Sequence, residues 1–154
     1  SLPEKRFEAA CKKNGNVKWF YKNGDKGQKY LSIIYYDNFN KDNLFYPDYL
    51  VMTKDGRLFI IETKGGEDKN GESRNIDKEK VDKKFEALKN YVQKHNTEHP
   101  ENVIYFAFVR DVEYEDDLGN KSYEVFYNND EWTEKMGEKW KPLKELFDGD
   151  VKKG

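Results

Sequence analysis

Residues 46–64 read YPDYLVMTKDGRLFIIETK. Two apolar runs, residues 49–53 and 57–61, flank Asp55-Gly56, and an Asp-Gly pair between apolar runs is one of the strongest signals for a β-hairpin. Both runs are apolar on both faces, a pattern typical of central strands that are covered from each side. The stretch therefore predicts a hairpin at the centre of a sheet, with charged residues at its open end.

Those charged residues share one face only under one turn geometry. Glu62 and Lys64 lie two residues apart on a strand, so their side chains point the same way and Thr63 points away. Burying them costs free energy unless they are paired or bound to something. A two-residue turn would send Asp48 to the opposite face, whereas a three-residue bulged loop sets Asp48 opposite Lys64 and in line with Glu62. Because a shared site requires Asp48 on the same face as Glu62, we predict the three-residue loop. A structure with Asp48 and Glu62 on opposite faces would exclude a shared site.

The residues before this hairpin predict one helix and two strands. Ser1-Leu2-Pro3-Glu4 has the form of a capping box, which predicts a helix that ends near Asn14-Gly15. Residues 17–21 and 30–36 are rich in β-branched and aromatic side chains and predict strands around a turn.

The residues after the hairpin predict a loop, a helix, two strands and a last helix. Residues 65–75 hold almost nothing to bury and predict a mobile loop. Apolar residues then recur at helical intervals at Val81, Phe85, Leu88 and Val92. Residues 103–109 predict a buried strand, residues 116–120 a turn and residues 123–127 a strand. A final helix is predicted over residues 130–146, packing Trp132, Met136 and Trp140. The predicted class is α/β.

Length and composition limit the class of protein and the compartment in which it is expected. The 154 residues suit one domain, 1–154, and 16% aromatic residues argue against disorder despite 38% charged residues. The single cysteine, Cys11, cannot form an internal disulfide, which favours a reducing, cytoplasmic setting. No apolar run has the length of a membrane span or a signal peptide, so we expect no membrane partner. The start at Ser1 without methionine suggests a C-terminal fragment of a larger protein.

The hairpin residues resemble the PD-(D/E)XK nucleases, whose namesake pattern is matched by Pro47-Asp48 and Glu62-Thr63-Lys64. The resemblance implies a restriction-endonuclease-like core of helix, three antiparallel strands, helix and strand, to which this chain adds a C-terminal hairpin and helix. More narrowly, residues 18–24, 45–49 and 61–65 resemble the C-terminal endonuclease domain of type III restriction enzyme helicase subunits. That likeness covers roughly the first two thirds of the chain.

The chemistry expected of these residues is metal-dependent hydrolysis of phosphodiester bonds, and the resemblance implies that the substrate is DNA. Asp48 and Glu62, with a backbone carbonyl near Thr63, supply the oxygen ligands that Mg²⁺ prefers, and Mn²⁺ would substitute. Lys64 would orient the attacking water and stabilise charge in the transition state. The resemblance implies a further glutamate on the first helix, matched by Glu4 with Glu8 as runner-up. As a capping-box residue, however, Glu4 needs no metal.

Further expectations concern the substrate and the partners. Lys80, Lys83 and Lys84 on the second helix are candidates for contacts with substrate phosphates, although a solvated helix face explains them better. The loop over residues 65–75 would close over bound nucleic acid. The formal net charge of −2 argues weakly against nucleic-acid binding, but carboxylates that hold a metal contribute to it. The resemblance implies double-stranded DNA as partner, a helicase or ATPase domain in the same full-length chain, and a methyltransferase or specificity subunit.

Other interpretations of the same residues stay open. Asp48 alone would be a turn residue after a proline, and Glu62 and Lys64 alone would be two solvated charges at a strand end. A catalytically silent nucleic-acid-binding or scaffolding domain of the same fold is the alternative of a different class, and a repair or junction-resolving nuclease is a third. The presence of all three residues, Asp48, Glu62 and Lys64, favours an endonuclease.

Overall fold

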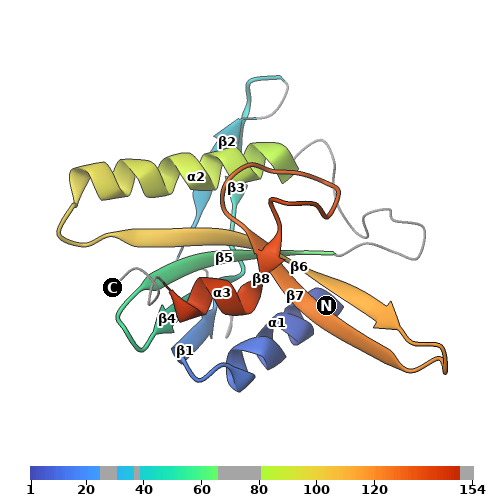
Figure 1. Cartoon of the computed structure of the whole chain (residues 1–154). Helices are drawn as coiled ribbons and strands as arrows, with labels where there is room; N and C mark the ends of the chain where they lie inside the picture. The colour runs from blue at the N-terminus through green and yellow to red at the C-terminus, as the bar shows by residue number, and fades with distance from the viewer. Residues whose placement is uncertain (25–30, 37–38, 66–80, 150–154) are drawn as a thin grey trace.

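A computed structural model of the chain describes residues 1–24, 31–36, 39–65 and 81–149. The elements in chain order (Figure 1) are α1 (Leu2–Lys13), β1 (Val17–Lys22), β2 (Ile33–Tyr36), β3 (Asp42–Phe45), β4 (Tyr49–Thr53), β5 (Leu58–Lys64), α2 (Val81–Glu98), β6 (Ile104–Glu115), β7 (Lys121–Asn128), β8 (Lys141–Pro142) and α3 (Leu143–Asp148). Within these ranges, no helix is both long and apolar enough to cross a membrane.

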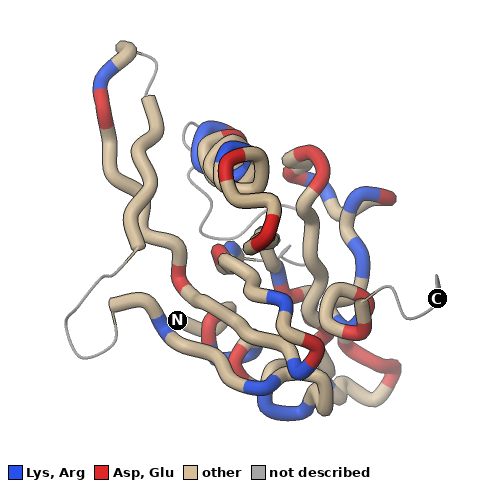
Figure 2. Tube along the Cα trace, turned by 90° about the vertical axis from the view of Figure 1, so that its left-hand side faces the viewer, with Lys and Arg blue, Asp and Glu red and all other residues tan. Residues whose placement is uncertain are grey.

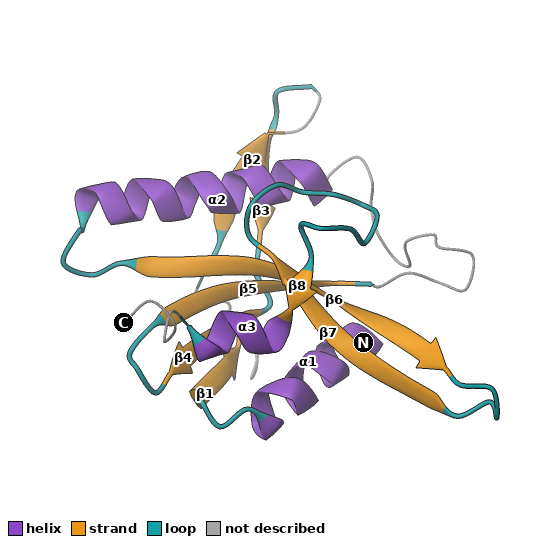
Figure 3. Cartoon of the chain, in the orientation of Figure 1, coloured by secondary structure: helices purple, strands orange, loops and turns teal. Residues whose placement is uncertain are grey.

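One mixed sheet organises these elements. Its six strands lie in the order β1-β4-β5-β6-β7-β8, while β2 and β3 form a separate two-stranded ribbon. The β5–β6 pair is parallel, and each of the other paired strands is antiparallel. The chain between β5 and β6 includes α2, as a crossover between parallel strands requires. The α/β class predicted from the sequence is therefore confirmed (Figure 3).

Helices cover both faces of the sheet (Figure 1). On one face, α1 and α3 pack against one set of alternating strand residues, which includes Tyr49 and Ile61. On the other, α2 and the β2–β3 ribbon pack against the intervening set, which includes Ile60 and Phe108. We call these the α1 face and the α2 face. Because alternate strand residues point to opposite faces, Glu62 and Lys64 belong to the α2 face and Thr63 to the α1 face.

The turn of the β4–β5 hairpin has the predicted length. Thr53 and Arg57 close it, with the Thr53 amide 3.0 Å from the Arg57 carbonyl oxygen, so three residues form the loop. Gly56 has φ +86°, the left-handed conformation that a bulged three-residue loop needs at this position. The register pairs Tyr49 with Ile61, and one step further sets Asp48 across from Glu62. We predicted Lys64 opposite Asp48, and this partner is wrong. The observed partner is Glu62, two residues earlier, because the loop consists of residues 54–56.

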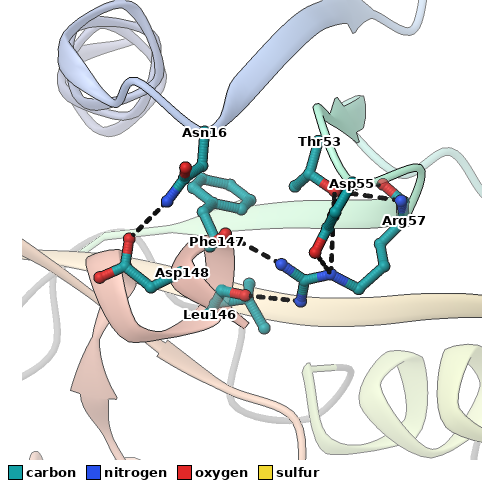
Figure 4. Close-up of polar contacts among 7 residues, drawn as sticks. All are labelled: Asn16, Thr53, Asp55, Arg57, Leu146, Phe147 and Asp148. Atoms are coloured by element: carbon teal, nitrogen blue, oxygen red, sulfur yellow. Dashed lines mark hydrogen bonds and ion pairs between the residues drawn. The ribbon is translucent and has the colours of Figure 1, made fainter. Parts of the chain in front are cut away.

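The turn also anchors the C-terminal helix (Figure 4). The Arg57 guanidinium donates hydrogen bonds to the carbonyl oxygens of Leu146, at 3.0 Å, and Phe147, at 2.9 Å. Its Nε also lies 2.9 Å from an Asp55 carboxylate oxygen. Asp148 accepts a further bond of 2.8 Å from the Asn16 side chain. These contacts satisfy carbonyls that a helix end leaves without partners and fasten α3 to the hairpin.

The two longer helices follow their sequence signals. In α1, the Ser1 hydroxyl accepts a bond from the Glu4 amide at 3.4 Å, and the helix ends at Lys13 with Asn14 as its C-terminal cap. In α2, the four apolar residues predicted to face the core are all buried: Val81, Phe85, Leu88 and Val92. Both helices therefore form where capping and periodicity predicted them.

The strands predicted around the first turn do not share a sheet. β1 pairs with β4, whereas β2 pairs with β3, a strand that was not predicted. Ile33 and Tyr35 of β2 are buried against the α2 face, while Ile34 and Tyr36 are exposed. Burial on α2 thus draws β2 away from the main sheet.

The helix predicted over residues 130–146 is wrong. Residues 129–140 are irregular, and α3 covers only Leu143–Asp148 after Pro142. Trp132 and Trp140 still meet, with ring centroids 5.6 Å apart, because the loop folds back on itself. Backbone carbonyls that a helix would have satisfied instead accept side-chain donors, as when Trp140 Nε1 donates to Thr133 at 3.0 Å. Of the predicted mobile loop over residues 65–75, all but Gly65 lies outside the described residues.

Candidate active site

Asp48 sits at the open end of the β4–β5 hairpin, immediately before β4 begins. One of its carboxylate oxygens, Oδ2, accepts hydrogen bonds from the Thr63 amide at 2.8 Å and the Thr63 hydroxyl at 2.6 Å. The Asp48 side chain thus takes the place of a backbone carbonyl in pairing the two strands. These bonds orient its carboxylate at the end of β5, next to Glu62.

Glu62 and Lys64 form an ion pair on the α2 face, as their spacing predicted. Lys64 Nζ lies 2.8 Å from Glu62 Oε2, and the side chains are only 15% and 7% exposed. The second Glu62 oxygen, Oε1, is buried without a hydrogen bond to any described residue. A buried carboxylate oxygen without a partner is costly, so this atom marks a place where a proton or cation belongs.

The electrostatics of Glu62 lead to the same conclusion. Burial, followed by the negative charge of Asp48, raises the pKa of Glu62 to about 8, although Lys64 opposes the shift. Glu62 Oε1 lacks a donor when both carboxyls are ionised, whereas a protonated Glu62 donates a hydrogen bond to Asp48, which also favours the neutral form. Two carboxyls this close repel one another when both are ionised. A cation between them would remove that repulsion and allow both to ionise.

The donor set suits a hard divalent cation. Asp48 and Glu62 offer carboxylate oxygens, and the backbone at Thr63 follows Glu62 in the sequence and is hydrogen-bonded to Asp48. Mg²⁺ is commonly held by one or two carboxylates together with water and substrate oxygens. Within the described part of the chain, no three acidic, histidine or cysteine side chains gather as a metal-binding group. A cation at this place would therefore have Asp48 and Glu62 as its acidic ligands, without a third such side chain from the described residues.

The two candidate glutamates on α1 already have partners. Glu4 lies 2.9 Å from Lys22 Nζ, and the Tyr49 hydroxyl donates a hydrogen bond to Glu8. The bond to Glu4, followed by its charge and those of Glu8 and Asp48, raises the pKa of Lys22. Glu4, Glu8 and Asp48 therefore all lie within electrostatic reach of Lys22 and Tyr49. Lys22, which the sequence did not single out, is what holds Glu4 in place.

The three lysines proposed for phosphate contacts have different surroundings. Lys84 is half-buried, with its Nζ 5.5 Å from the centroid of the Phe45 ring and 5.8 Å from that of Tyr35. Lys83, also half-buried, faces a groove beside β2. Lys80 lies outside the described residues. The structure thus brings Asp48, Glu62, Thr63 and Lys64 together, and places Lys83 and Lys84 on α2.

A buried arginine that the sequence reading missed supports the end of β5. Arg110 is 1% exposed and pairs with Lys64 across the parallel strands. Its Nε donates a hydrogen bond of 2.9 Å to the Gly65 carbonyl, and its guanidinium lies 5.3 Å from the Trp140 ring centroid. An arginine directly after the apolar run 103–109 was the available signal. The Arg110 side chain fixes the backbone at Gly65, just beyond Lys64.

The candidate site as a whole lies where β5 ends, close to the N-terminus of α1 (Figure 1). Two short pieces of chain supply it, Asp48 before β4 and residues 62–64 at the end of β5, so the hairpin register alone determines their meeting. Comparisons of the chain with protein-family models, with curated proteins and with solved structures found no match.

Proposed function

We propose that this chain is a Mg²⁺-dependent endonuclease domain that hydrolyses phosphodiester bonds in DNA, and that it is the cleavage module of a type III restriction-modification enzyme. The observation that carries the nuclease proposal is the buried carboxyl of Glu62, whose Oε1 accepts no hydrogen bond from the described residues and whose pKa the charge of the neighbouring Asp48 raises. The resemblance of residues 18–24, 45–49 and 61–65 to type III helicase subunits carries the narrower assignment. Under it, double-stranded DNA is the substrate, a helicase domain belongs to the same protein, and the setting is cytoplasmic.

The order of elements supports a restriction-endonuclease-like core. α1 is followed by the antiparallel strands β1, β4 and β5, then by α2 and by β6 parallel to β5. The resemblance implies the same order of helix, three antiparallel strands, helix and strand. The β2–β3 ribbon and the C-terminal β7, β8 and α3 are then additions to that core.

Each site residue has a distinct task in the proposed reaction. When bound, the divalent cation would supply a Lewis acid and lower the pKa of water. Asp48 and Glu62 would hold it, and the bonds from Thr63 keep the Asp48 carboxylate in place for this. Lys64 is held at Glu62, so its ammonium group would orient the attacking water and stabilise negative charge on the phosphate.

Plasmid cleavage tests the proposal directly. Supercoiled plasmid is incubated with Mg²⁺ or Mn²⁺ and either the wild-type protein, Asp48→Ala or Lys64→Ala, and nicked and linear products are quantified. We expect each substitution to lower the cleavage rate at least 100-fold, as removal of a preorganised charge from an active site does. Lys144→Ala, an exposed lysine on α3, is the matched control and should cut like wild type. Equal cleavage by all four proteins would place the activity elsewhere.

Metal binding provides a second measurement. Isothermal titration with Mn²⁺ should show one site that is lost in Asp48→Ala and kept in Lys144→Ala. A protein that binds the metal at Asp48 but does not cut DNA would favour the silent, scaffolding alternative. A protein that neither binds metal nor cuts would contradict the proposed function.

A further inference from the structure

A surface groove lies along the junction where β2 of the ribbon contacts α2. Its volume is about 730 Å³, and it is lined by residues 32–36 along β2 and by one stripe of α2 at positions 83, 86, 87, 90, 91 and 94. The spacing of three and four residues places that stripe on a single side of α2 over about three turns. Figure 2 shows the ribbon standing beside the helix and extending past it. The groove is therefore an open channel with one strand wall and one helix wall.

Aromatic side chains are exposed on both walls. Tyr36 of β2 is 55% exposed and Tyr91 of α2 is 39% exposed, and Ile34 beside Tyr36 is 52% exposed. A cluster of large apolar groups left in water at a concave surface marks a binding site. Exposed tyrosine rings are platforms on which nucleobases stack, and each stacked base adds measurable affinity.

The charge of the groove is opposite to that of the whole chain. Lys83 and Lys94 contribute two positive charges and Glu86 one negative charge, which leaves +1 in a chain whose formal net charge is −2. Neither lysine forms an ion pair with any residue in the described ranges. Asn90, between them on the stripe, offers an amide to base edges. The groove therefore combines positive charge, a polar reader and aromatic rings.

The groove and the candidate active site lie on the same face of the sheet, the α2 face. The ribbon wall leads through β3 to Phe45, and three residues further along the chain stands Asp48. The Phe45 ring packs on Phe108, with centroids 6.4 Å apart, and Phe108 is the β6 residue paired with Glu62. The inner end of the ribbon, at Phe45, is therefore the end of the groove wall that is nearer in the chain to the two carboxylates.

We propose that this groove binds a single strand of nucleic acid and guides it toward Asp48 and Glu62. Duplex DNA is excluded from this role, because its bases are already stacked and hide their faces from protein rings. The strand-binding half of the proposal stands on the groove alone, and the guiding half rests on the proposed nuclease function. The preferred substrate is then a duplex with an unpaired strand, such as a flap or a region opened by a helicase.

Binding is measured without cleavage, using the whole chain in EDTA. Fluorescence anisotropy compares a labelled 12-nucleotide single strand with a blunt duplex of the same sequence. We expect the single strand to bind at least tenfold more tightly. The double variant Tyr36→Ala with Tyr91→Ala should weaken single-strand binding at least tenfold, and Lys83→Glu with Lys94→Glu should weaken it further and flatten its dependence on salt.

Controls match these variants in exposure and chemistry. Tyr114→Ala removes a tyrosine that is 46% exposed near the end of β6, and Lys144→Glu reverses an exposed charge on α3. Both should bind like wild type. Because the four groove residues are not part of the buried core, far-UV circular dichroism and thermal melting should confirm that their variants fold.

The outcomes separate this proposal from the nuclease proposal. Groove variants that bind single strands like wild type, or a wild type that prefers duplex, would overturn it. Loss of self-association in the tyrosine variant without loss of nucleic-acid binding would assign the groove to a second copy of the chain and overturn it as well. If Asp48→Asn binds single strands normally and no protein cuts DNA, the groove stands and the nuclease proposal fails. If the wild type cuts flaps faster than duplex and the groove variants lose that preference, both hold.

Discussion

Glu62 is buried beside a second carboxylate, and one of its oxygens has no hydrogen-bond partner among the described residues. A core selected for stability alone would place an apolar residue at such a position, since the pair costs free energy in the absence of a cation. Lys64 compensates one oxygen only. The burial of Glu62 is therefore best explained by a ligand that it binds. In the absence of that ligand, the pH dependence of stability should reveal the free-energy cost of ionising Glu62.

The first prediction concerns the stability of the metal-free protein against pH. A pKa of about 8 in the folded protein, above the ordinary value of 4.5, means that folding favours the protonated carboxyl. Its contribution is fully present below about pH 4.5 and is lost as the pH rises to about 8. Urea unfolding in EDTA should show that wild type loses on the order of 1–3 kcal/mol more than Glu62→Gln over this range. Parallel pH profiles for the two proteins would contradict the shift.

The second prediction separates the two glutamates of α1. Glu8 accepts a bond from the buried Tyr49, whereas Glu4 is held by Lys22 at the margin of the site. Glu8→Gln should therefore lower the free energy of unfolding by about 1–2 kcal/mol with little effect on cleavage. Glu4→Gln should lower the cleavage rate on the order of tenfold and leave stability nearly unchanged. Plasmid cleavage and urea unfolding of both variants decide this, and the reverse pattern would assign the role to Glu8.

At the scale of elements, the β4–β5 hairpin has two ends with separate tasks. Its turn carries Arg57, which fastens α3, and its open end carries Asp48 and residues 62–64. A strand rises about 3.3 Å per residue, so the five residues from Arg57 to Glu62 separate the two ends by roughly 16 Å. Changes at the turn should therefore affect stability without reaching the chemistry.

The third prediction tests that separation. Arg57→Ala leaves the Leu146 and Phe147 carbonyls without their donors and should lower the free energy of unfolding by about 1–3 kcal/mol. Gly149→Ala should act similarly, because a Cβ there would stand 2.6 Å from Arg57 Nη2 and Gly149 has φ +68°. Urea unfolding measures both, with Lys144→Ala as the neutral control. Mn²⁺ affinity should stay within twofold of wild type, and a large loss would show that the two ends are coupled.

The same elements show what local sequence determines. Asp55-Gly56 predicted the hairpin but allowed a turn of two or three residues, and the expectation of a shared site selected three, which is the length observed. The β3 strand was not predictable, because it begins with Asp42 and Asn43. Its formation depends on pairing with β2, which is buried against α2, a contact distant in sequence. Trp132, Met136 and Trp140 repeat every four residues as in a helix, yet side-chain donors from elsewhere satisfy that backbone. Tertiary contacts overrode the local period.

At the scale of the whole molecule, Cys11 reports on global unfolding. It is 2% exposed within the α1-face core, and burial, with a smaller contribution from Glu8, raises the pKa of its thiol to about 12. The fourth prediction is that Ellman's reagent at about pH 8 labels Cys11 only through unfolding. The labelling rate should rise steeply with urea, and Phe7→Ala, which removes a core neighbour and costs about 3–5 kcal/mol, should accelerate it more than 100-fold. Rapid labelling of the native protein that ignores urea would contradict this.

The contact between Asp48 and Thr63 has one more consequence for the molecule as a whole. The Asp48 carboxylate, which is available to a ligand, also makes the last hydrogen bond between the β4 and β5 ends of the hairpin, because its Oδ2 accepts a hydrogen bond from the Thr63 amide. Ligand affinity and strand cohesion at this end are therefore thermodynamically linked, and the linkage is reciprocal. A change that promotes fraying at this end of the hairpin weakens ligand binding. A ligand that fixes Asp48 suppresses the fraying by the same free energy.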